Sequence, residues 1–265
     1  MTTTTAACIE ESFNIAGTSL QMRRGGSGAP LLILHGELGV PDWLRAYELL
    51  AQHYSVYVPS LPGFGSSEIP DWMMSVRDLS AWVNWFVRDY GLSTPLNVIG
   101  FSLGGWVATE LATANSAIFS KMVLVGAAGI KPREGEIWDY FLNGAKDAFR
   151  KSFLNPAATE YVKYYGKDWT PDEAEQVECN REAAIRFLWR PYMHSVTLPG
   201  LLPAIGIPTL LLWGRQDAIV PMSSCELYKQ GIPGAQVAVI EDCGHMPEME
   251  KPEEFVKAVI EFLGT

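Results

Sequence analysis

Residues 100–104 read GFSLG and place Ser102 between two glycines, directly after the strand-like run 96–100. A serine at a sharp turn from a strand into a helix has a strained backbone, so its close neighbours must be small. The helix that begins near Leu103 would add unpaired N–H groups and a positive dipole end beside the serine oxygen. Small residues also surround a serine by chance, so the prediction of a nucleophilic Ser102 depends on partners elsewhere.

A serine hydroxyl is a poor nucleophile at neutral pH and needs a base, which an acid holds in place. His245 follows the last expected strand, 236–240, where a loop returns to the carboxyl edge of the sheet. We predict that it is the base. The other histidines have plainer interpretations: His35 shapes a turn, His53 is solvated after a helix, and His194 lies within the central helical segment.

Asp217 is the predicted acid because it follows the apolar run 208–213, again at the carboxyl edge of the sheet. Its alternative interpretation is an N-terminal cap for the helix that begins soon after it. The rival position, after the strand 121–125, reads GAAG and has no carboxylate. Glu241 and Asp242 share a loop with the histidine, are poorly placed to hold its far nitrogen, and are expected to be solvated.

Alternating strands and helices would position these three side chains. Continuous apolar runs are typical of strands covered on both faces, and a period near 3.6 is typical of amphipathic helices. The first two strands are expected to form an antiparallel hairpin. The expected strands cover residues 10–15, 19–24, 31–34, 54–59, 96–100, 121–125, 208–213 and 236–240, and the expected helices cover residues 42–53, 76–90, 104–114, 222–230 and 252–263.

The pattern changes between residue 129 and about residue 200, where no strand-like run occurs and aromatic residues accumulate. We predict one α/β core formed by residues 1–130 and 200–265, with a helical insertion at 131–199. Most aromatic residues of this insertion should pack it on the core, and some should line an apolar pocket. The candidate substrate-binding residues are Trp138, Phe141, Trp189, Arg190 and Met246.

Composition narrows the possible partners of this 265-residue chain. The net charge of −10 disfavours nucleic acid and anionic membrane surfaces. No apolar run reaches the roughly 18 residues of a membrane helix, and no signal peptide is visible, so a soluble, cytoplasmic protein is expected. The four scattered cysteines argue against a disulfide framework or a zinc site. The oligomeric state cannot be read from the sequence.

The GFSLG run, Asp217 and His245, with His35 and Gly36 upstream, resemble the α/β-hydrolase superfamily in type and in order along the chain. The resemblance implies an α/β-hydrolase fold: a mostly parallel eight-stranded sheet flanked by helices. It also implies that the helical cap is inserted after the sixth strand, where the aromatic-rich segment lies.

The same resemblance implies an oxyanion hole formed by the main-chain N–H groups of Glu37 and Leu103. Ser102 would attack a carbonyl, with His245 as base, and form an acyl-enzyme that water then hydrolyses. A carboxylate near an oxyanion would be unhelpful, so the Glu37 side chain is expected to point away. This chemistry requires no metal and no organic cofactor.

The resemblance leaves several functions open. We rank first a carboxylesterase that cleaves small to medium hydrophobic or aryl esters. The alternative is a C–C hydrolase acting on vinylogous diketones from meta-cleavage of aromatic rings. Its substrate carboxylate would need cationic or polar groups, for which Arg186 and Arg190 are candidates, although helix arginines are more often solvated or paired.

Two further alternatives are cofactor-free haloperoxidase or perhydrolase activity, and a non-catalytic ligand-binding member of the fold. Haloalkane dehalogenases and epoxide hydrolases carry an aspartate at the position of Ser102 and are excluded. The expected partner is therefore a small molecule with an ester or related carbonyl group.

Overall fold

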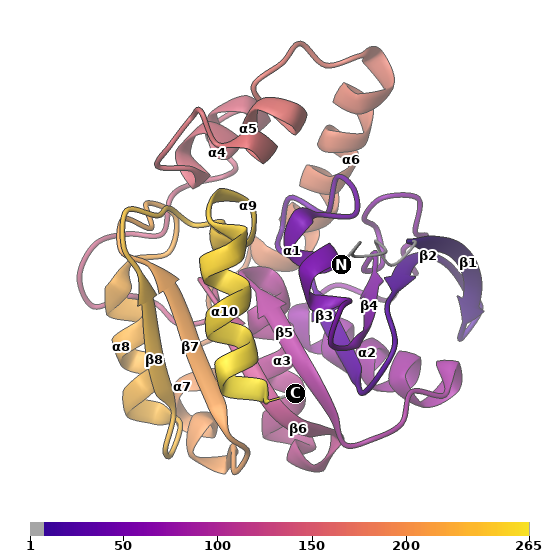
Figure 1. Ribbon diagram of the computed structural model, residues 1–265, viewed down its shortest axis with the longest axis vertical. Coiled ribbons are helices and arrows are strands. Elements are labelled where there is room, and N and C mark those ends of the chain that lie inside the picture. Colours follow the sequence, from indigo (N-terminus) through magenta and orange to yellow (C-terminus); the bar gives the residue numbers. More distant parts are fainter. Residues whose placement is uncertain (1–7, 265) are drawn as a thin grey trace, which may run out of the picture.

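The computed structural model describes residues 8–264, which form one twisted sheet covered by helices (Figure 1). The sheet has eight strands in the order β1-β2-β4-β3-β5-β6-β7-β8. β1 pairs with β2 and β2 with β4 in antiparallel fashion, and all other neighbours are parallel. The strands are β1 (Ile9–Ile15), β2 (Thr18–Gly25), β3 (Pro30–Leu34), β4 (Ser55–Pro59), β5 (Leu96–Phe101), β6 (Phe119–Val125), β7 (Thr209–Gly214) and β8 (Gln236–Ile240).

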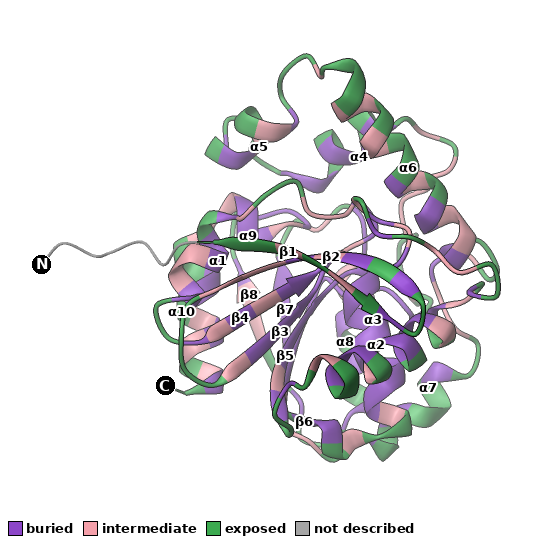
Figure 2. Ribbon diagram, turned by 90° about the vertical axis from the view of Figure 1, so that its right-hand side faces the viewer, coloured by how far each residue is buried: buried purple, intermediate pink, exposed green. Residues whose placement is uncertain are grey.

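Helices cover both faces of the sheet, which explains why its central strands are continuously apolar. Figure 2 shows α1 (Arg45–Leu50) and α10 (Pro252–Leu263) on one side of the strands. It shows α2 (Val76–Tyr90), α3 (Leu103–Ala114) and α8 (Met222–Gly231) on the other. The side chains of β3 and β7 are buried almost throughout. The predicted eight-stranded, mostly parallel sheet flanked by helices is confirmed.

A helical layer lies above the carboxyl edge of the sheet, inserted between β6 and β7. It contains α4 (Ala145–Ser152), α5 (Thr159–Tyr164) and α6 (Pro171–Leu188). Stacked aromatic rings hold it together, with the ring centroids of Phe149 and Tyr165 3.7 Å apart. Helices are present after the sixth strand, where the cap is predicted, and the role of this segment as a cap stays a prediction. Its boundaries at 130/131 and 199/200 stay predictions.

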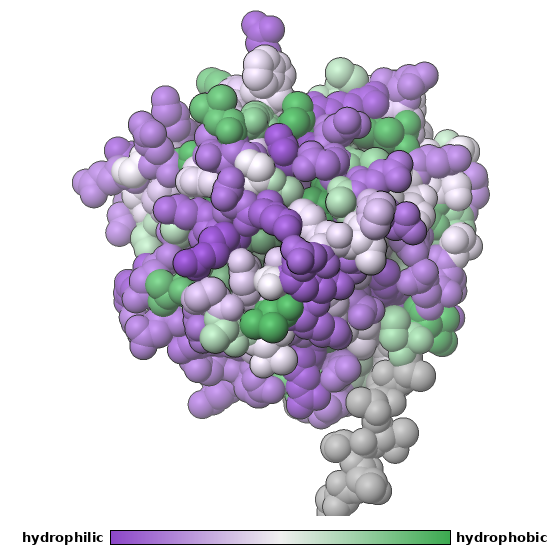
Figure 3. Space-filling model, turned by 90° about the horizontal axis from the view of Figure 1, so that it is seen from above, coloured by the Kyte–Doolittle hydropathy of each residue, from purple (hydrophilic) through white to green (hydrophobic). Residues whose placement is uncertain are grey.

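The cap surface is largely hydrophilic when seen from above, and hydrophobic side chains form separate small groups on it (Figure 3). A capping box starts α6, in which the Thr170 side chain and the Glu173 side chain each bond to the other's main chain. Such boxes satisfy two of the N–H groups that a helix leaves unpaired at its start. The cap helices are thus stabilised locally as well as by aromatic packing.

Most expected elements agree with the structure within a few residues, and the helix expected at 42–53 is the main exception. Only α1 (Arg45–Leu50) is helical there, because the first helical bonds accept at the Leu44 carbonyl and the last turn tightens after Leu50. The sequence analysis missed the short helices α7 (Leu198–Leu201) and α9 (Pro247–Glu250) and the 3₁₀ turns η1 (Ser116–Ile118) and η2 (Leu202–Ala204). Between residues 8 and 264, no helix is long and apolar enough to cross a membrane.

Candidate active site

Ser102 sits at a strained turn between β5 and α3, with φ of 44° and ψ of −108°. The turn is held by main-chain bonds, since the Ser102 N–H donates to Val125 and its carbonyl accepts from Ala128. A Cβ at Gly100 would lie 2.5 Å from the Gly104 carbonyl oxygen, and one at Gly104 would collide with the Leu34 carbonyl. Both flanking glycines of the GFSLG run are therefore required by close backbone approach.

His245 and Asp217 meet at the carboxyl edge from loops after neighbouring strands, β8 and β7. His245 Nδ1 lies 2.8 Å from Asp217 Oδ2, and both side chains are buried. The other carboxyl oxygen of Asp217 accepts the main-chain N–H groups of Ile219 and Val220, each at 2.9 Å. Asp217 is thus fixed on both oxygens, and its local bonds hold its own loop rather than capping α8, whose N-cap is Pro221.

The electrostatic surroundings favour a proton on His245. Burial lowers its pKa, but the charge and hydrogen bond of Asp217, with smaller contributions from Glu37 and Glu248, outweigh burial and raise the pKa to about 9. With Nδ1 engaged by Asp217, the Nε2 atom is the one free to exchange a proton with a neighbour. The histidine is therefore positioned as a proton carrier whose charged form is strongly stabilised.

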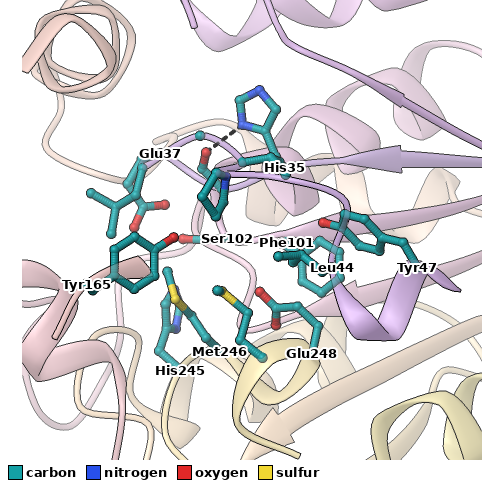
Figure 4. Close-up of a pocket in the computed structure, with 16 residues that line it drawn as sticks. His35, Glu37, Leu44, Tyr47, Phe101, Ser102, Tyr165, His245, Met246 and Glu248 are labelled. Atoms are coloured by element: carbon teal, nitrogen blue, oxygen red, sulfur yellow. Dashed lines mark hydrogen bonds between the residues drawn. The ribbon is translucent and has the colours of Figure 1, made fainter. Parts of the chain in front are cut away.

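Ser102 and His245 line the same cavity (Figure 4). The Ser102 hydroxyl is buried and has no hydrogen-bond partner among the described residues. A serine–histidine hydrogen bond is often long before substrate arrives, so this geometry is compatible with the roles predicted for both.

The remaining histidines are placed as expected. His35 Nε2 accepts the Leu61 N–H at 2.9 Å and its Nδ1 donates to the Gly36 carbonyl at 2.7 Å, so it fixes the turn after β3. Burial lowers its pKa to about 4. His53 is exposed, and His194 bonds the Tyr192 carbonyl outside the Ser102 cavity. The prediction that His35 shapes a turn is confirmed.

The two acidic residues that precede His245 in its loop are exposed to solvent, as expected. Glu241 and Asp242 are exposed, and Glu241 forms an ion pair with Arg215 at 2.7 Å. Instead, the cap supports this loop, because the Ser152 carbonyl of α4 accepts the His245 N–H at 2.7 Å. The position of the histidine therefore depends on both the core and the cap.

The main-chain N–H groups of Glu37 and Leu103 donate no hydrogen bond within residues 8–264. Both residues belong to the elements that border Ser102: the loop after β3 and the first turn of α3. The Cβ of Ser102 lies 3.4 Å from the position that a Cβ on Gly36 would take, which brings the two elements close together. An oxyanion hole requires unpaired N–H donors beside the attacking group, and this role for Glu37 and Leu103 stays a prediction.

The expectation that the Glu37 side chain points away from the site is wrong. Glu37 is only 2% exposed, its carboxyl group lines the Ser102 cavity, and its Oε2 atom has no hydrogen-bond partner among the described residues. The loop after β3 folds back through a Gly39 N–H to Gly36 carbonyl bond, which leaves the side chain under the cap. There it faces Tyr140, whose pKa is raised well above its usual range by burial and then by the Glu37 charge.

The cavity is small, about 30 Å³. Its walls come from the loop after β3, from α1, from α9 and from the cap residue Tyr165. Glu248 of α9 also lines it, and burial raises the pKa of this carboxyl group to about 8. Sequence reasoning missed Tyr140, Tyr165 and Glu248. The one available signal was an acidic residue flanked by Pro247 and Met249, three positions after the predicted base.

Of the candidate substrate-binding residues, only Met246 lines the Ser102 cavity. Trp138 lines a separate cleft of about 690 Å³. Phe141 packs against Trp189, which is 63% exposed, and Arg190 is exposed as well. A substrate-binding role for these four residues stays a prediction. Residues 8–264 hold no group of three or more His, Cys, Asp or Glu side chains that could bind a metal ion.

Comparison with known proteins agrees with the fold. The family model for the alpha/beta hydrolase fold matches residues 29–252. A 2-hydroxy-6-oxo-6-(2'-aminophenyl)hexa-2,4-dienoic acid hydrolase of Metapseudomonas resinovorans is 22% identical, over 97% of this chain and 92% of its own. A pimeloyl-[acyl-carrier protein] methyl ester esterase of Aeromonas hydrophila is 24% identical, over 93% of this chain and 100% of its own.

Solved structures share the fold. A 2-hydroxy-6-oxo-6-phenylhexa-2,4-dienoate hydrolase from Rhodococcus sp. superposes with a TM-score of 0.78 at 19% identity, covering 98% of this chain and 100% of that one. At this identity the likeness concerns the fold alone.

Proposed function

Because this chain belongs to the alpha/beta hydrolase family, we propose that it is a serine hydrolase that cleaves carboxylic esters through an acyl-enzyme. The observation that carries the proposal is the strained Ser102 turn in one cavity with His245, which Asp217 holds at 2.8 Å. The proposed catalytic residues are Ser102, His245 and Asp217.

Each residue has a defined role in the proposed reaction. His245 Nε2 accepts the Ser102 proton as the serine oxygen attacks the carbonyl carbon, and Asp217 keeps Nδ1 protonated and stabilises the imidazolium. The Glu37 and Leu103 N–H groups receive the oxyanion, and one such donor typically lowers the barrier by about 3 kcal/mol. His245 then protonates the leaving alcohol, and water releases the acid by the same steps in reverse order.

The charges around the cavity favour an esterase over a C–C hydrolase. Substrates of the second kind carry a carboxylate, as the name of the M. resinovorans relative states, and need cationic or polar groups to bind it. Arg186 donates to the main-chain carbonyls of Pro70 and Asp71, and Arg190 is exposed. Neither arginine lines the Ser102 cavity, whereas Glu37 does. The apolar part of the wall suits small hydrophobic acyl groups.

A parallel kinetic screen tests the proposal. Alkyl esters of graded acyl length, aryl esters and a ring-cleavage dienoate are compared for the wild type and for Ser102→Ala. We expect hydrolysis of short alkyl and aryl esters, loss of that activity in Ser102→Ala, and little turnover of the dienoate. Turnover of the dienoate alone supports the C–C hydrolase, and ester hydrolysis that survives in Ser102→Ala contradicts a serine mechanism. A folded protein inactive on all of them is a non-catalytic member of the fold.

A cytoplasmic location stays a prediction.

A further inference from the structure

One buried side chain of α6 ties two loops of the core to the inserted segment. Asn180 is 7% exposed, and its Nδ2 donates to the Leu38 carbonyl, in the loop after β3, at 3.1 Å. Its Oδ1 accepts the Gly65 N–H, in the loop after β4, at 2.9 Å. A main-chain N–H can only donate, so the amide cannot be turned round, and Nδ2 must face Leu38. Figure 1 shows α6 descending from the inserted layer toward the core.

The helix approaches the loop after β3 at main-chain distance. Gly39 has φ of +77°, and a Cβ there would lie 2.5 Å from Asn180 Nδ2. Within residues 8–264, no side chain other than that of Asn180 bonds to the main chain of residues 37–39. The conformation of this stretch therefore depends directly on α6.

Two planar peptide units connect the Asn180 bond to the Glu37 N–H. The carbonyl and the N–H of a trans peptide unit point in opposite directions, so fixing one fixes the other. Asn180 fixes the Leu38 carbonyl, and with it the Gly39 N–H. That N–H donates to the Gly36 carbonyl at 3.1 Å, in the peptide unit that carries the Glu37 N–H. The predicted oxyanion donor thus stands at the end of a chain of contacts that begins on α6.

His35 is the second anchor of this peptide unit. Its Nδ1 donates to the Gly36 carbonyl at 2.7 Å. A carbonyl oxygen accepts two hydrogen bonds, and the second restricts the rotation that one alone leaves free. The core supplies one anchor through His35, and the inserted segment controls the other through Asn180.

We propose that Asn180 is a positioning residue for ester hydrolysis: it holds the Glu37 N–H toward the oxyanion that forms at Ser102. The assignment rests on the proposed function and extends it to a residue of the inserted segment. Asn180 lies outside the Ser102 cavity, so it acts through the loop after β3. A misdirected oxyanion donor weakens binding of the transition state and leaves substrate binding intact, so its loss should appear in kcat and not in KM.

Asn180→Asp tests the assignment, because aspartate keeps the acceptor for the Gly65 N–H but places a charged oxygen against the Leu38 carbonyl. Phenyl acetate is compared with O-phenyl thioacetate, in which sulfur replaces the carbonyl oxygen, and the released phenol is followed by absorbance. Sulfur is a weak acceptor, so the sulfur ester gains little from the N–H. We expect kcat for phenyl acetate to fall by about tenfold or more at similar KM, and the oxygen-to-sulfur ratio of kcat/KM to fall by about tenfold.

The ratio separates positioning from a general structural role, because a loss of folded protein or a change in the His245 pKa slows both esters alike. Gln176→Ala is the matched control. Gln176 lies on the same helix and donates to the Gly65 carbonyl at 2.9 Å, but among the described residues it makes no bond to the loop after β3. Its kcat and its ratio should equal those of the wild type. Asn180→Ala adds no charge and should lower the ratio as Asn180→Asp does, and thermal melting checks the folding of every variant.

Ester hydrolysis with a ratio that both Asn180 variants leave unchanged, or that Gln176→Ala lowers equally, overturns the assignment and leaves the esterase intact. If the wild type hydrolyses no ester, the proposed function fails, and amide hydrogen exchange decides whether Asn180 holds the loop. Exchange of the Gly39 N–H that is about tenfold faster in Asn180→Asp, but not in Gln176→Ala, supports this hold. Unchanged exchange in Asn180→Asp overturns it.

Discussion

Two loops at the carboxyl edge of the sheet each carry a buried histidine, and the two histidines differ completely in their chemistry. His35, after β3, is bonded only to main-chain groups, and burial lowers its pKa to about 4. His245, after β8, is bonded to Asp217, and its pKa is raised to about 9 against the effect of burial. The residue type and its place after a strand are the same, so the partner decides the role.

The two histidines also differ in whether they hold the fold or can exchange a proton. His35 bonds to the Leu61 N–H and the Gly36 carbonyl, and so fixes the loop that carries Glu37. Among the described residues, the His245 ring bonds only to the carboxylate of Asp217, which stabilises the charged form of the ring. One histidine therefore stabilises the fold around the site, and the other is free to move a proton.

Replacing each histidine with glutamine should affect a different property, catalysis for His245 and stability for His35. We expect His245→Gln to lower kcat/KM for a short aryl ester by at least about 10⁴-fold, because the serine loses its base. We expect His35→Gln to lower the free energy of unfolding by about 1–3 kcal/mol, because a flexible amide cannot keep both the Leu61 N–H and the Gly36 carbonyl at the positions that the rigid imidazole ring holds, with a much smaller kinetic effect. Ester kinetics and urea unfolding of both variants check this. Equal kinetic losses would contradict the division of roles.

Displacing the His245 ring without changing any polar group should have an intermediate effect. Gly126 has φ of +51°, and a Cβ there would lie 2.9 Å from His245 Nδ1 and 3.2 Å from Asp217 Oδ2. We expect Gly126→Ala to lower kcat/KM by about 10²-fold, the typical cost of a displacement near 1 Å. Gly234→Ala is the control, since its φ is +70° and nothing lies within 4 Å. It should show the same backbone strain with unchanged kinetics, and a similar loss in both variants would contradict this explanation.

The pKa of His245 predicts the pH dependence of activity. Only the neutral imidazole can accept the Ser102 proton, so kcat/KM should rise by about tenfold per pH unit through neutrality and level off above about pH 9. The stability effect has the opposite sign, because the folded pKa lies above the ordinary 6.5: the stabilisation is fully present below pH 6.5 and is lost as the pH rises through about 9. Rate profiles and urea unfolding across this range check both. A kcat/KM that is flat from pH 6 to 9 would show that His245 is already neutral.

Much of the fold could be predicted because its signals are local. The helix expected at 76–90 coincides with α2, since the Ser75 side chain caps its first turn and Gly91 ends it in a left-handed conformation. The contact between His245 and Asp217 followed from strand order, because carboxyl ends of neighbouring parallel strands lie at one edge. Their catalytic roles stay predictions.

The side chains of the cavity could not be predicted, because their positions depend on contacts between segments that are distant in the sequence. The direction of the Glu37 side chain is set by the cap, where Tyr140 lies about a hundred positions further along the chain. Glu248 enters the cavity only because α9, a helix with no periodic signal of its own, turns it inward. A local pattern identifies which residues end a strand, but which neighbours reach them is decided by tertiary packing.

Covalent labelling with a fluorophosphonate, followed by peptide mass mapping, tests most directly that Ser102 is a nucleophile activated by His245. The predicted result is one label per wild-type chain, on the peptide that contains Ser102, with labelling at least about 10²-fold slower in His245→Gln and near the wild-type rate in folded His35→Gln. A folded wild-type chain that stays unlabelled, carries its label elsewhere, or reacts equally fast without His245 would contradict the account.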